Sequence, residues 1–275
     1  MNDSAKIQRV LSLELPELAP YRTLRRTVAH RQQGIFVAEG EKVVRRLLES
    51  PLEVISLLLT PDWCGRLAAT GHLKGREGAT AFLAEGELLR GIVGFNIHQG
   101  IMAVGKVPAD GSLDALAPAQ LLVALDGLRI SENVGVIVRN GAAFGVQAIL
   151  VGETACSPYL RRAVRNSMGA VFQMPIIHVP CLADVLERLK LRYGSEIVVA
   201  DPHGATTIYD TSLAGSVCIV LGNEDYGVSP EIAGLATARA AIPMHNRTDS
   251  LNVASASAVF LYEAARQRVR GGGGV

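Results

Sequence analysis

The sequence predicts an α/β protein whose C-terminal part contains a mostly parallel sheet, preceded by a smaller α/β domain. From residue 121 onward, short apolar runs alternate with segments of helical periodicity, as in domains built from parallel strands and crossover helices. The chain has 275 residues, of which 49% are hydrophobic, so it can bury one large core or two moderate ones. The stretch PADGSLDALAPAQ at 108–120 has the proline, glycine and small residues of a linker. We therefore predict domains at 1–107 and 119–275, joined by a linker at 108–118.

In the first domain, helical and strand-like segments alternate. GEKVVRRLLES at 40–50 carries its apolar residues at helical spacing, which predicts a helix. VISLLLTP at 54–61 is typical of a strand closed by proline, and GIMAVGKV at 100–107 predicts the last strand of the domain.

In the second domain, the same patterns predict a longer alternating series. The predicted strands are LLVALDG (121–127), AILVG (148–152), IIHV (176–179), EIVVAD (196–201), SVCIVLG (216–222) and ARAAIPM (238–244). The predicted helices cover about 133–143, about 158–168, 182–194, a short stretch after Ser229, and about 250–269.

Composition narrows the classes of function. The formal net charge is +1, so any attraction to nucleic acid must come from local patches of charge. No apolar run approaches the roughly 18 to 20 residues of a membrane span, and the N-terminus lacks the layout of a signal peptide, so we expect a cytoplasmic protein with no membrane partner. The cysteines form no C-x-x-C pair and the histidines show no H-x-x-x-H spacing, so we expect reduced thiols and no metal site. The cysteines are Cys64, Cys156, Cys181 and Cys218.

The loop LGNEDYGVS at 221–229 follows a predicted buried strand, where α/β proteins commonly bind a nucleotide. It carries Glu224 and Asp225 but no lysine, and no P-loop or dinucleotide fingerprint follows any predicted strand, which argues against phosphate-binding kinases and dehydrogenases. A ligand with a purine, a ribose and a positive centre suits such a loop, and S-adenosylmethionine is a ligand of that kind. The simpler alternative is that this loop is a solvent-exposed acidic turn that binds no ligand.

Two further stretches differ from simple connections. In SENVGVIVRNGAAFG at 131–145, Arg139 interrupts a helical apolar pattern, either as a functional group or as an arginine that snorkels to the surface. In IPMHNRTDSLNVASASAVF at 242–260, a polar turn follows a strand, and Ser250 or Asp249 is a candidate cap for a helix that begins near Leu251.

These stretches also carry a resemblance to a known family. NVGVIVRNGAAFG, IVLGNEDYGVS and IPMHNRTDSLNVASASAVFLYEAARQ resemble, in order and approximate spacing, the three motifs of the SpoU (TrmH-like) family of RNA ribose 2'-O-methyltransferases. NSMGAVFQMPI at 166–176 is similar to a further segment of that family, so the resemblance covers roughly 119–269. GIFVAEGEKVVRRLLES and GFNIHQGIMAVGKV resemble the substrate-binding domain that often precedes the catalytic domain, a fold akin to a small ribosomal RNA-binding protein.

The resemblance implies a SPOUT fold with a deep trefoil knot, a topology that general folding rules would not predict. It also implies a homodimer with the active site near the subunit interface and S-adenosylmethionine as cofactor. Five residues match the polar positions of the three motifs and are implied to be catalytic: Asn133, Arg139, Glu224, Ser250 and Asn252. The residues implied to hold the cofactor are Leu221, Gly222, Asn223, Ile242, Pro243, Met244, Leu251 and Asn252.

The roles within this site follow from chemistry as well as from the family. The family proposal makes Arg139 a general base, but guanidinium groups stay protonated in proteins, so we favour a role in gripping an RNA phosphate and orienting the ribose hydroxyl. Glu224 either orients Arg139 or only fixes its loop, and Ser250 either acts in catalysis or only caps a helix. The family usually has glycine where this chain has Asn246, a residue that tolerates the left-handed region.

Two arginine clusters are candidates for RNA binding, although a solvated helix face is the simpler reading of such clusters. The first comprises Arg22, Arg25, Arg26 and Arg31, and the second, at helical spacing, Arg161, Arg162 and Arg165. We therefore expect methyl transfer from S-adenosylmethionine to a ribose 2'-hydroxyl in structured RNA, rRNA in preference to tRNA. The alternative is a non-catalytic RNA-binding or ribosome-assembly protein that retains the fold.

Overall fold

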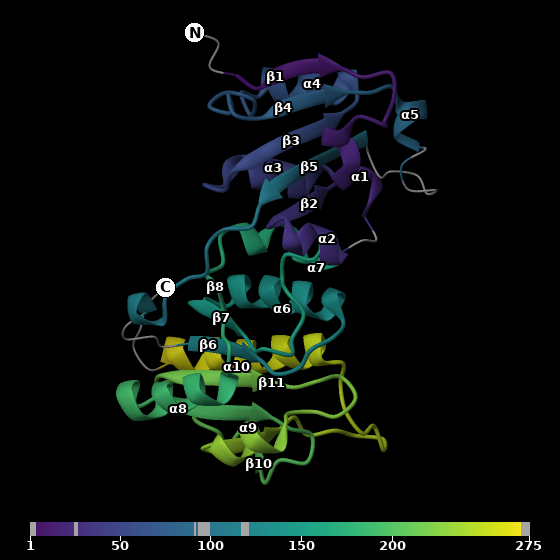
Figure 1. Ribbon diagram of the computed structural model, residues 1–275. Helices are drawn as coiled ribbons and strands as arrows, with labels where there is room; N and C mark the ends of the chain where they lie inside the picture. The colour runs from purple at the N-terminus through teal and green to yellow at the C-terminus, as the bar shows by residue number, and fades with distance from the viewer. Residues whose placement is uncertain (1–3, 25–26, 91, 93–99, 117–120, 271–275) are drawn as a thin grey trace. The chain divides into compact units, whose positions relative to one another are not determined.

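The computed structural model describes residues 4–24, 27–90, 92, 100–116 and 121–270 (Figure 1). The chain divides into two compact units, one formed by residues 1–109 with 159–173, the other by 110–158 with 174–275. Each unit contains a sheet with helices packed on it, so the predicted mixed α/β class is confirmed. None of the described helices is long and apolar enough to cross a membrane.

The first unit is built on a mixed sheet of five strands in the order β1-β4-β3-β5-β2. β5 runs antiparallel to β2 and β3, whereas β1, β4 and β3 are mutually parallel. The strands are β1 (Lys6–Arg9), β2 (Ile35–Glu39), β3 (Val54–Leu59), β4 (Thr80–Leu83) and β5 (Ile101–Lys106). The helices before β5 are η1 (Pro16–Leu18), α1 (Ala19–Arg22), α2 (Thr27–Gln32), α3 (Glu41–Glu49), α4 (Pro61–Ala69) and α5 (Gly86–Arg90). The helix predicted at 40–50 and the strands predicted at 54–61 and 100–107 are confirmed.

Residues 159–173 belong to this first unit, contrary to the prediction that 119–275 forms one domain. They contain α7 (Arg161–Asn166) and η4 (Ala170–Phe172), which is shorter helical structure than the single helix predicted at about 158–168. The ring of Phe36 on β2 stacks on Phe172, with centroids 5.4 Å apart, and lies 5.6 Å from the ring of Tyr159. Helical periodicity reveals that a helix has an apolar face but not which sheet buries it, so the sequence could not assign this segment.

The second unit contains a sheet of seven strands in the order β10-β12-β9-β11-β6-β7-β8, and all six neighbouring pairs are parallel. The strands are β6 (Leu121–Leu125), β7 (Ala148–Val151), β8 (Ile176–His178), β9 (Glu196–Ala200), β10 (Thr206–Thr207), β11 (Val217–Leu221) and β12 (Ala238–Ala241). The helices are η3 (Leu113–Leu116), α6 (Ser131–Ala143), α8 (Leu182–Tyr193), α9 (Pro230–Leu235) and α10 (Val253–Arg270). Every strand predicted for this part is present, and the two-residue β10 is the one that was not predicted.

Helices cover both faces of the seven-stranded sheet, as its continuous apolar strands require. On one face, Leu186 of α8 and Ile232 of α9 pack into a buried cluster with alternate residues of the central strands. On the other face, α6 and α10 pack against each other, and the Nδ2 of Asn140 donates hydrogen bonds to the carbonyl of Ala254 (3.0 Å) and the hydroxyl of Ser257 (2.9 Å).

The described part of the predicted linker belongs to the second unit from residue 110 onward. The carboxylate of Asp110 accepts hydrogen bonds from the backbone N–H of His178 (3.2 Å) and contacts the Nδ1 of its ring (2.6 Å). The carboxylate of Asp114 pairs with Arg188 (2.5 Å) and Arg192 (3.3 Å) on α8. Composition predicts a linker here, and the two acids tie the described part from residue 110 to β8 and α8. Residues 117 and 118 lie outside the described residues.

Candidate active site

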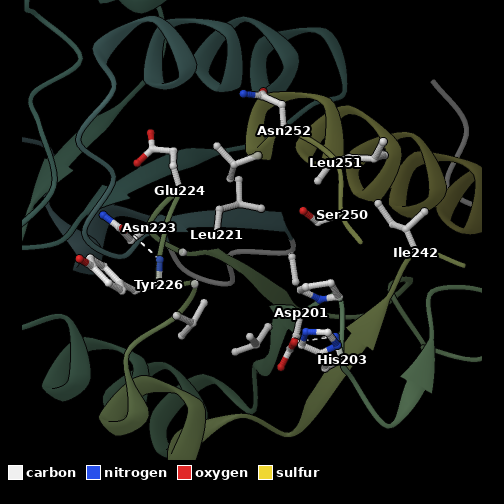
Figure 2. A pocket seen from close by; sticks show the side chains of 18 of the residues that line it. Asp201, His203, Leu221, Asn223, Glu224, Tyr226, Ile242, Ser250, Leu251 and Asn252 are labelled. Atoms are coloured by element: carbon white, nitrogen blue, oxygen red, sulfur yellow. Dashed lines mark hydrogen bonds between the residues drawn. The ribbon is translucent and has the colours of Figure 1, made fainter. Parts of the chain in front are cut away.

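A cavity of about 570 Å³ lies at the carboxyl ends of β9, β11 and β12 (Figure 2). These three strands are neighbours in the sheet, and ligands bind parallel sheets at this edge because the connecting loops diverge there. The loops after the strands and the start of α10 form the wall, and all of them belong to the second unit. The volume is typical of a site for a small ligand such as a nucleoside.

The loop after β11 folds back tightly on itself at the cavity. Asn223 and Gly227 exchange two backbone hydrogen bonds of 2.9 Å, and the side-chain Nδ2 of Asn223 donates to the carbonyl of Gly127 (2.7 Å). A Cβ atom on Gly222 would lie 2.3 Å from the backbone of Gly227 and Val228, so only glycine fits there. Glycine at this point of the cavity wall therefore lets the loop close tightly on itself.

Three polar residues far apart in the sequence form one hydrogen-bonded network beside the cavity. The Nδ2 of Asn133 on α6 donates to the carboxylate of Glu224 (3.0 Å), and the Nδ2 of Asn252 donates to the Oδ1 of Asn133 (3.1 Å). Glu224 also accepts hydrogen bonds from the backbone N–H groups of Arg129 and Ile130, both at 3.1 Å. The network thus joins the first turn of α6, the loop after β11 and the start of α10.

The environment of Glu224 favours its charged form. Burial on its own would raise the pKa of this carboxyl group, but the hydrogen bonds from Asn133, Arg129 and Ile130 outweigh burial and lower the pKa below its ordinary value. The carboxylate also sits at the N-terminal end of α6, where the helix dipole favours negative charge. Glu224 is therefore an ionised anchor for the helix start.

The match with a known protein family covers the segments that form this site. The sequence model of the SpoU rRNA Methylase family matches residues 120–262, which is more than half of the 275 residues. The chain belongs to this family. It is 30% identical, over 96% of its length and 93% of the relative's, to an uncharacterized tRNA/rRNA methyltransferase of Mycobacterium tuberculosis. It is 33% identical, over 62% of its length and 61% of the relative's, to a 23S rRNA (uridine(2479)-2'-O)-methyltransferase of Streptomyces viridochromogenes.

Solved structures agree with this assignment. The AdoMet-bound rRNA methyltransferase of Sinorhizobium meliloti aligns with a TM-score of 0.81 and 27% identity, over 94% of this chain and 98% of that one. The predicted SpoU resemblance and the predicted class of enzyme, a methyltransferase, are therefore confirmed.

The structure brings most of the residues implied by the SpoU motifs to the cavity. Of the residues implied to be catalytic, Glu224, Ser250 and Asn252 line it, and Asn133 reaches it through Glu224. Of those implied to hold the cofactor, seven line it: Leu221, Gly222, Asn223, Ile242, Met244, Leu251 and Asn252. Pro243 does not line it and is exposed.

The SpoU arginine, Arg139, is placed differently from the other motif residues. Its side chain is exposed, does not line the cavity, and makes no hydrogen bond or ion pair with any described residue. An α-helix turns by about 100° per residue, so Arg139 points about 120° away from Asn133 around α6. Of the two roles considered for Glu224, its contacts with Arg129, Ile130 and Asn133 are those expected of a residue that fixes its loop, and it makes no described contact with Arg139.

The residue that caps α10, in the third SpoU motif, differs from the predicted one. The helix begins at Val253, and the Oδ1 of Asn252 accepts a hydrogen bond from the N–H of Ala254 (2.9 Å), so Asn252 is the cap instead of Ser250 or Asp249. Ser250 is exposed and makes no hydrogen bond among the described residues, although it lines the cavity. Asn246 has φ of +55°, which confirms the left-handed turn expected from asparagine.

Residues that sequence reasoning missed form another wall of the SpoU cavity. Asp201 and His203 follow β9 and lie across the cavity from Glu224 in Figure 2. The carboxylate of Asp201 accepts hydrogen bonds from the backbone N–H of His203 (2.8 Å) and the Nε of Arg239 (2.7 Å). Burial opposes ionisation of Asp201, but these partners lower its pKa. The predicted strand 196–201 ends at this aspartate, and that was the available signal.

The predicted RNA-binding arginines differ in whether they form ion pairs within the chain. Arg25 and Arg26 lie outside the described residues, and Arg22 pairs with Glu14 (2.6 Å). Arg161 and Arg165 pair with one buried carboxylate, that of Glu39, at 2.7 and 3.3 Å. Arg162 is exposed at the surface of α7, and Arg31 is exposed and forms no ion pair with a described residue. No described group of three or more His, Cys, Asp or Glu side chains is arranged to hold a metal ion.

Proposed function

We propose that this SpoU-family protein transfers a methyl group from S-adenosylmethionine to a ribose 2'-hydroxyl in RNA, and that its substrate is ribosomal RNA. The observation that carries the proposal is the network of Asn133, Glu224 and Asn252 beside the cavity. The network links all three motif segments at the edge of the sheet where a ligand would bind, and each of its members is a polar residue of the SpoU motifs.

The cavity fits S-adenosylmethionine, the methyl donor of the family. Leu221, Ile242 and Leu251 supply apolar contacts for an adenine ring, and Gly222 lets the loop after β11 fold tightly at the cavity wall. Glu224 and Asp201 at the wall are compatible with a ligand that bears a positive charge and no phosphate. S-adenosylmethionine supplies a methyl group already activated by its sulfonium.

The ribose hydroxyl must be placed for attack, a role that we assign to Arg139; as the oxygen–methyl bond forms, the hydroxyl proton passes to solvent and the sulfonium leaves as a neutral thioether. A guanidinium can grip an RNA phosphate with two parallel hydrogen bonds and so hold the neighbouring 2'-hydroxyl for attack. Arg139 points away from the cavity of its own chain and has no described partner there, which favours action at the cavity of a second subunit. Glu224 and Asn133 hold the helix that carries it, and Ser250 is available to contact substrate.

This assignment requires a homodimer with the active site near the subunit interface. Two exposed apolar side chains on α10, Val259 and Tyr262, offer a surface for this interface beside α6. The ring of Tyr262 packs edge-on against that of Phe144, with centroids 6.3 Å apart. We also propose that the C-terminal part of the chain forms the deep trefoil knot of SPOUT proteins. The three loops after β9, β11 and β12 converge on one cavity, as such a knot requires.

The five-stranded first unit is proposed to bind the RNA substrate, with Arg31 as an exposed cation of the first predicted arginine cluster. His245 and Arg247, in the polar turn before α10, are proposed to touch RNA close to the reaction centre, since both are exposed. The preference for rRNA over tRNA rests on the resemblance of the first domain to a ribosomal-protein module.

The test is transfer of tritiated methyl from S-adenosylmethionine to total RNA from a strain that lacks the gene, followed by mapping of ribose methylation. Incorporation into one 2'-O position of rRNA is the expected result, whereas a tRNA position would overturn the choice of substrate. A protein that binds S-adenosylmethionine and RNA but incorporates no label would be the non-catalytic alternative.

A further inference from the structure

Tyr226 is an exposed aromatic side chain at the rim of the cavity. Three of the large apolar or aromatic side chains exposed in the described residues line the cavity: Ile130 at 47%, Tyr226 at 84% and Leu251 at 39%. Tyr226 is the most exposed of the three, and its ring and hydroxyl have no described partner. Exposed apolar groups that gather at one place commonly mark a binding surface.

The backbone under Tyr226 is held firmly. The Oδ1 of Asn223 accepts hydrogen bonds from the N–H groups of Asp225 (2.9 Å) and Tyr226 (3.1 Å), and the pair Asn223 and Gly227 closes the hairpin. In Figure 2 the ring extends from this hairpin away from Leu221. An aromatic ring on a rigid backbone binds with little loss of conformational entropy, because only two side-chain torsions must be fixed.

Tyr226 lies at the rim of the cavity and is far more exposed than the buried residues of its wall. Leu221, in the cavity wall, is 1% exposed, whereas Tyr226 is 84% exposed at the rim. The second reactant of the proposed reaction must approach from outside this rim and present its ribose to the cavity. Its base is attached directly to that ribose, and it is a flat apolar surface of the kind that aromatic side chains bind.

We propose that the ring of Tyr226 stacks on the base of the nucleotide whose ribose is methylated. The inference rests on the proposed function and adds the group that holds the base. Stacking fixes the plane of the base, and the glycosidic bond then limits where the 2'-hydroxyl lies. Every base has a face that can stack, so Tyr226 contributes affinity and orientation without selecting the base. An unpaired, unstacked nucleotide is required, as in a loop or bulge.

The first test compares Tyr226→Ala and Tyr226→Phe in single-turnover methylation of total RNA from a strain that lacks the gene. Stacking on one base corresponds to a loss of about 10- to 100-fold on truncation to alanine, and phenylalanine keeps the rate within about threefold because it keeps the ring. The control is Tyr209→Ala, a tyrosine of the same unit that is 72% exposed but does not line the cavity, and it should leave the rate unchanged.

The second test does not depend on methyl transfer. A short single-stranded RNA carrying one 2-aminopurine is titrated with the full-length protein, and the quenching of its fluorescence reports stacking. Quenching should be present with the native protein and with Tyr226→Phe and lost with Tyr226→Ala. If the native protein quenches the probe but methylates no RNA, the proposed function fails and the stacking site stands.

Three results would overturn the stacking site. Tyr226→Ala that retains both full rate and full quenching shows that the ring does not touch RNA. A tenfold loss of S-adenosylmethionine affinity in Tyr226→Ala, measured by calorimetry, would show that Tyr226 contacts the cofactor. Dissociation of Tyr226→Ala to monomers, measured by sedimentation, would show that Tyr226 contacts another subunit.

Discussion

The polar residues of the three motifs fall into two groups that differ in where their partners lie. Asn133, Glu224 and Asn252 find their hydrogen-bond partners within one chain and tie three segments together. Arg139, on the same helix as Asn133, is exposed and has no described partner. The fold preorganises the first group, and we propose that Arg139 acts on RNA at the cavity of a second subunit. The first unit repeats the contrast, with Arg161 and Arg165 held by Glu39 and Arg31 exposed.

The largest expected effect is on Arg139. Arg139→Ala should lower the single-turnover methylation rate by at least about 100-fold, because a positioned group at the reaction centre is lost. S-adenosylmethionine affinity by calorimetry and the melting temperature should stay nearly unchanged, since the side chain has no described partner. Arg139→Lys should restore little, because lysine lacks the planar two-pronged geometry. A near-native rate for Arg139→Ala would remove this arginine from the mechanism.

Glu39→Gln should lower the stability of the fold without affecting the methyl-transfer step. The side chain is buried at 8% exposure and pairs with two arginines, so its neutralisation should lower the free energy of unfolding by about 2 to 3 kcal/mol. Chemical denaturation measures this loss. The matched control is Glu87→Gln, a glutamate 92% exposed and 4.0 Å from Arg90, which should change stability by less than about 0.5 kcal/mol. Equal effects of both variants would mean that the buried pair is no stronger than a surface one.

Glu224→Gln should show a stability loss that depends on pH. The folded protein holds the pKa of Glu224 below its ordinary value, so this carboxylate stabilises the fold above its unfolded pKa and loses that contribution as pH falls through the folded pKa. The variant should therefore lose about 1 to 2 kcal/mol near pH 7, and the difference from the native protein should shrink below about pH 4. Urea unfolding across this range is the measurement. Asp225→Asn, in the same loop, serves as the control, and a difference independent of pH would contradict the anchoring role.

The smallest expected effect is on RNA affinity in the first unit. Arg31→Ala should reduce the slope of log affinity against log salt by about 0.7 to 0.9, the value for one lost phosphate contact. Arg161→Ala should lower stability and leave the slope unchanged, because its charge is already paired with Glu39. Fluorescence anisotropy with a labelled rRNA fragment at several salt concentrations measures both slopes. A larger change of slope for Arg161 than for Arg31 would reverse the comparison in this unit.

Much of the second unit followed from local pattern. Its strands β6, β7 and β11 are continuous apolar runs, because a parallel sheet is buried on both faces, and such runs are visible in the sequence. The left-handed turn at Asn246 was also readable, since asparagine is among the few residues that tolerate that conformation. Pattern placed the cap of α10 wrongly, at Ser250 or Asp249, because Ser250, Asp249 and Asn252 are all good caps and only the helix start decides between them.

The sequence by itself determined the class of the fold, the order of its strands along the chain and the three segments that carry polar motif residues, because these depend on local periodicity and residue type. The tertiary structure decided which of those residues meet. It joined Asn133 to Glu224 and Asn252, left Arg139 facing outward, and placed Asp201 in the cavity. It also assigned residues 159–173 to the first unit through Phe36 and Glu39. Partners separated by about a hundred residues are selected by packing and burial, and no local pattern records that choice.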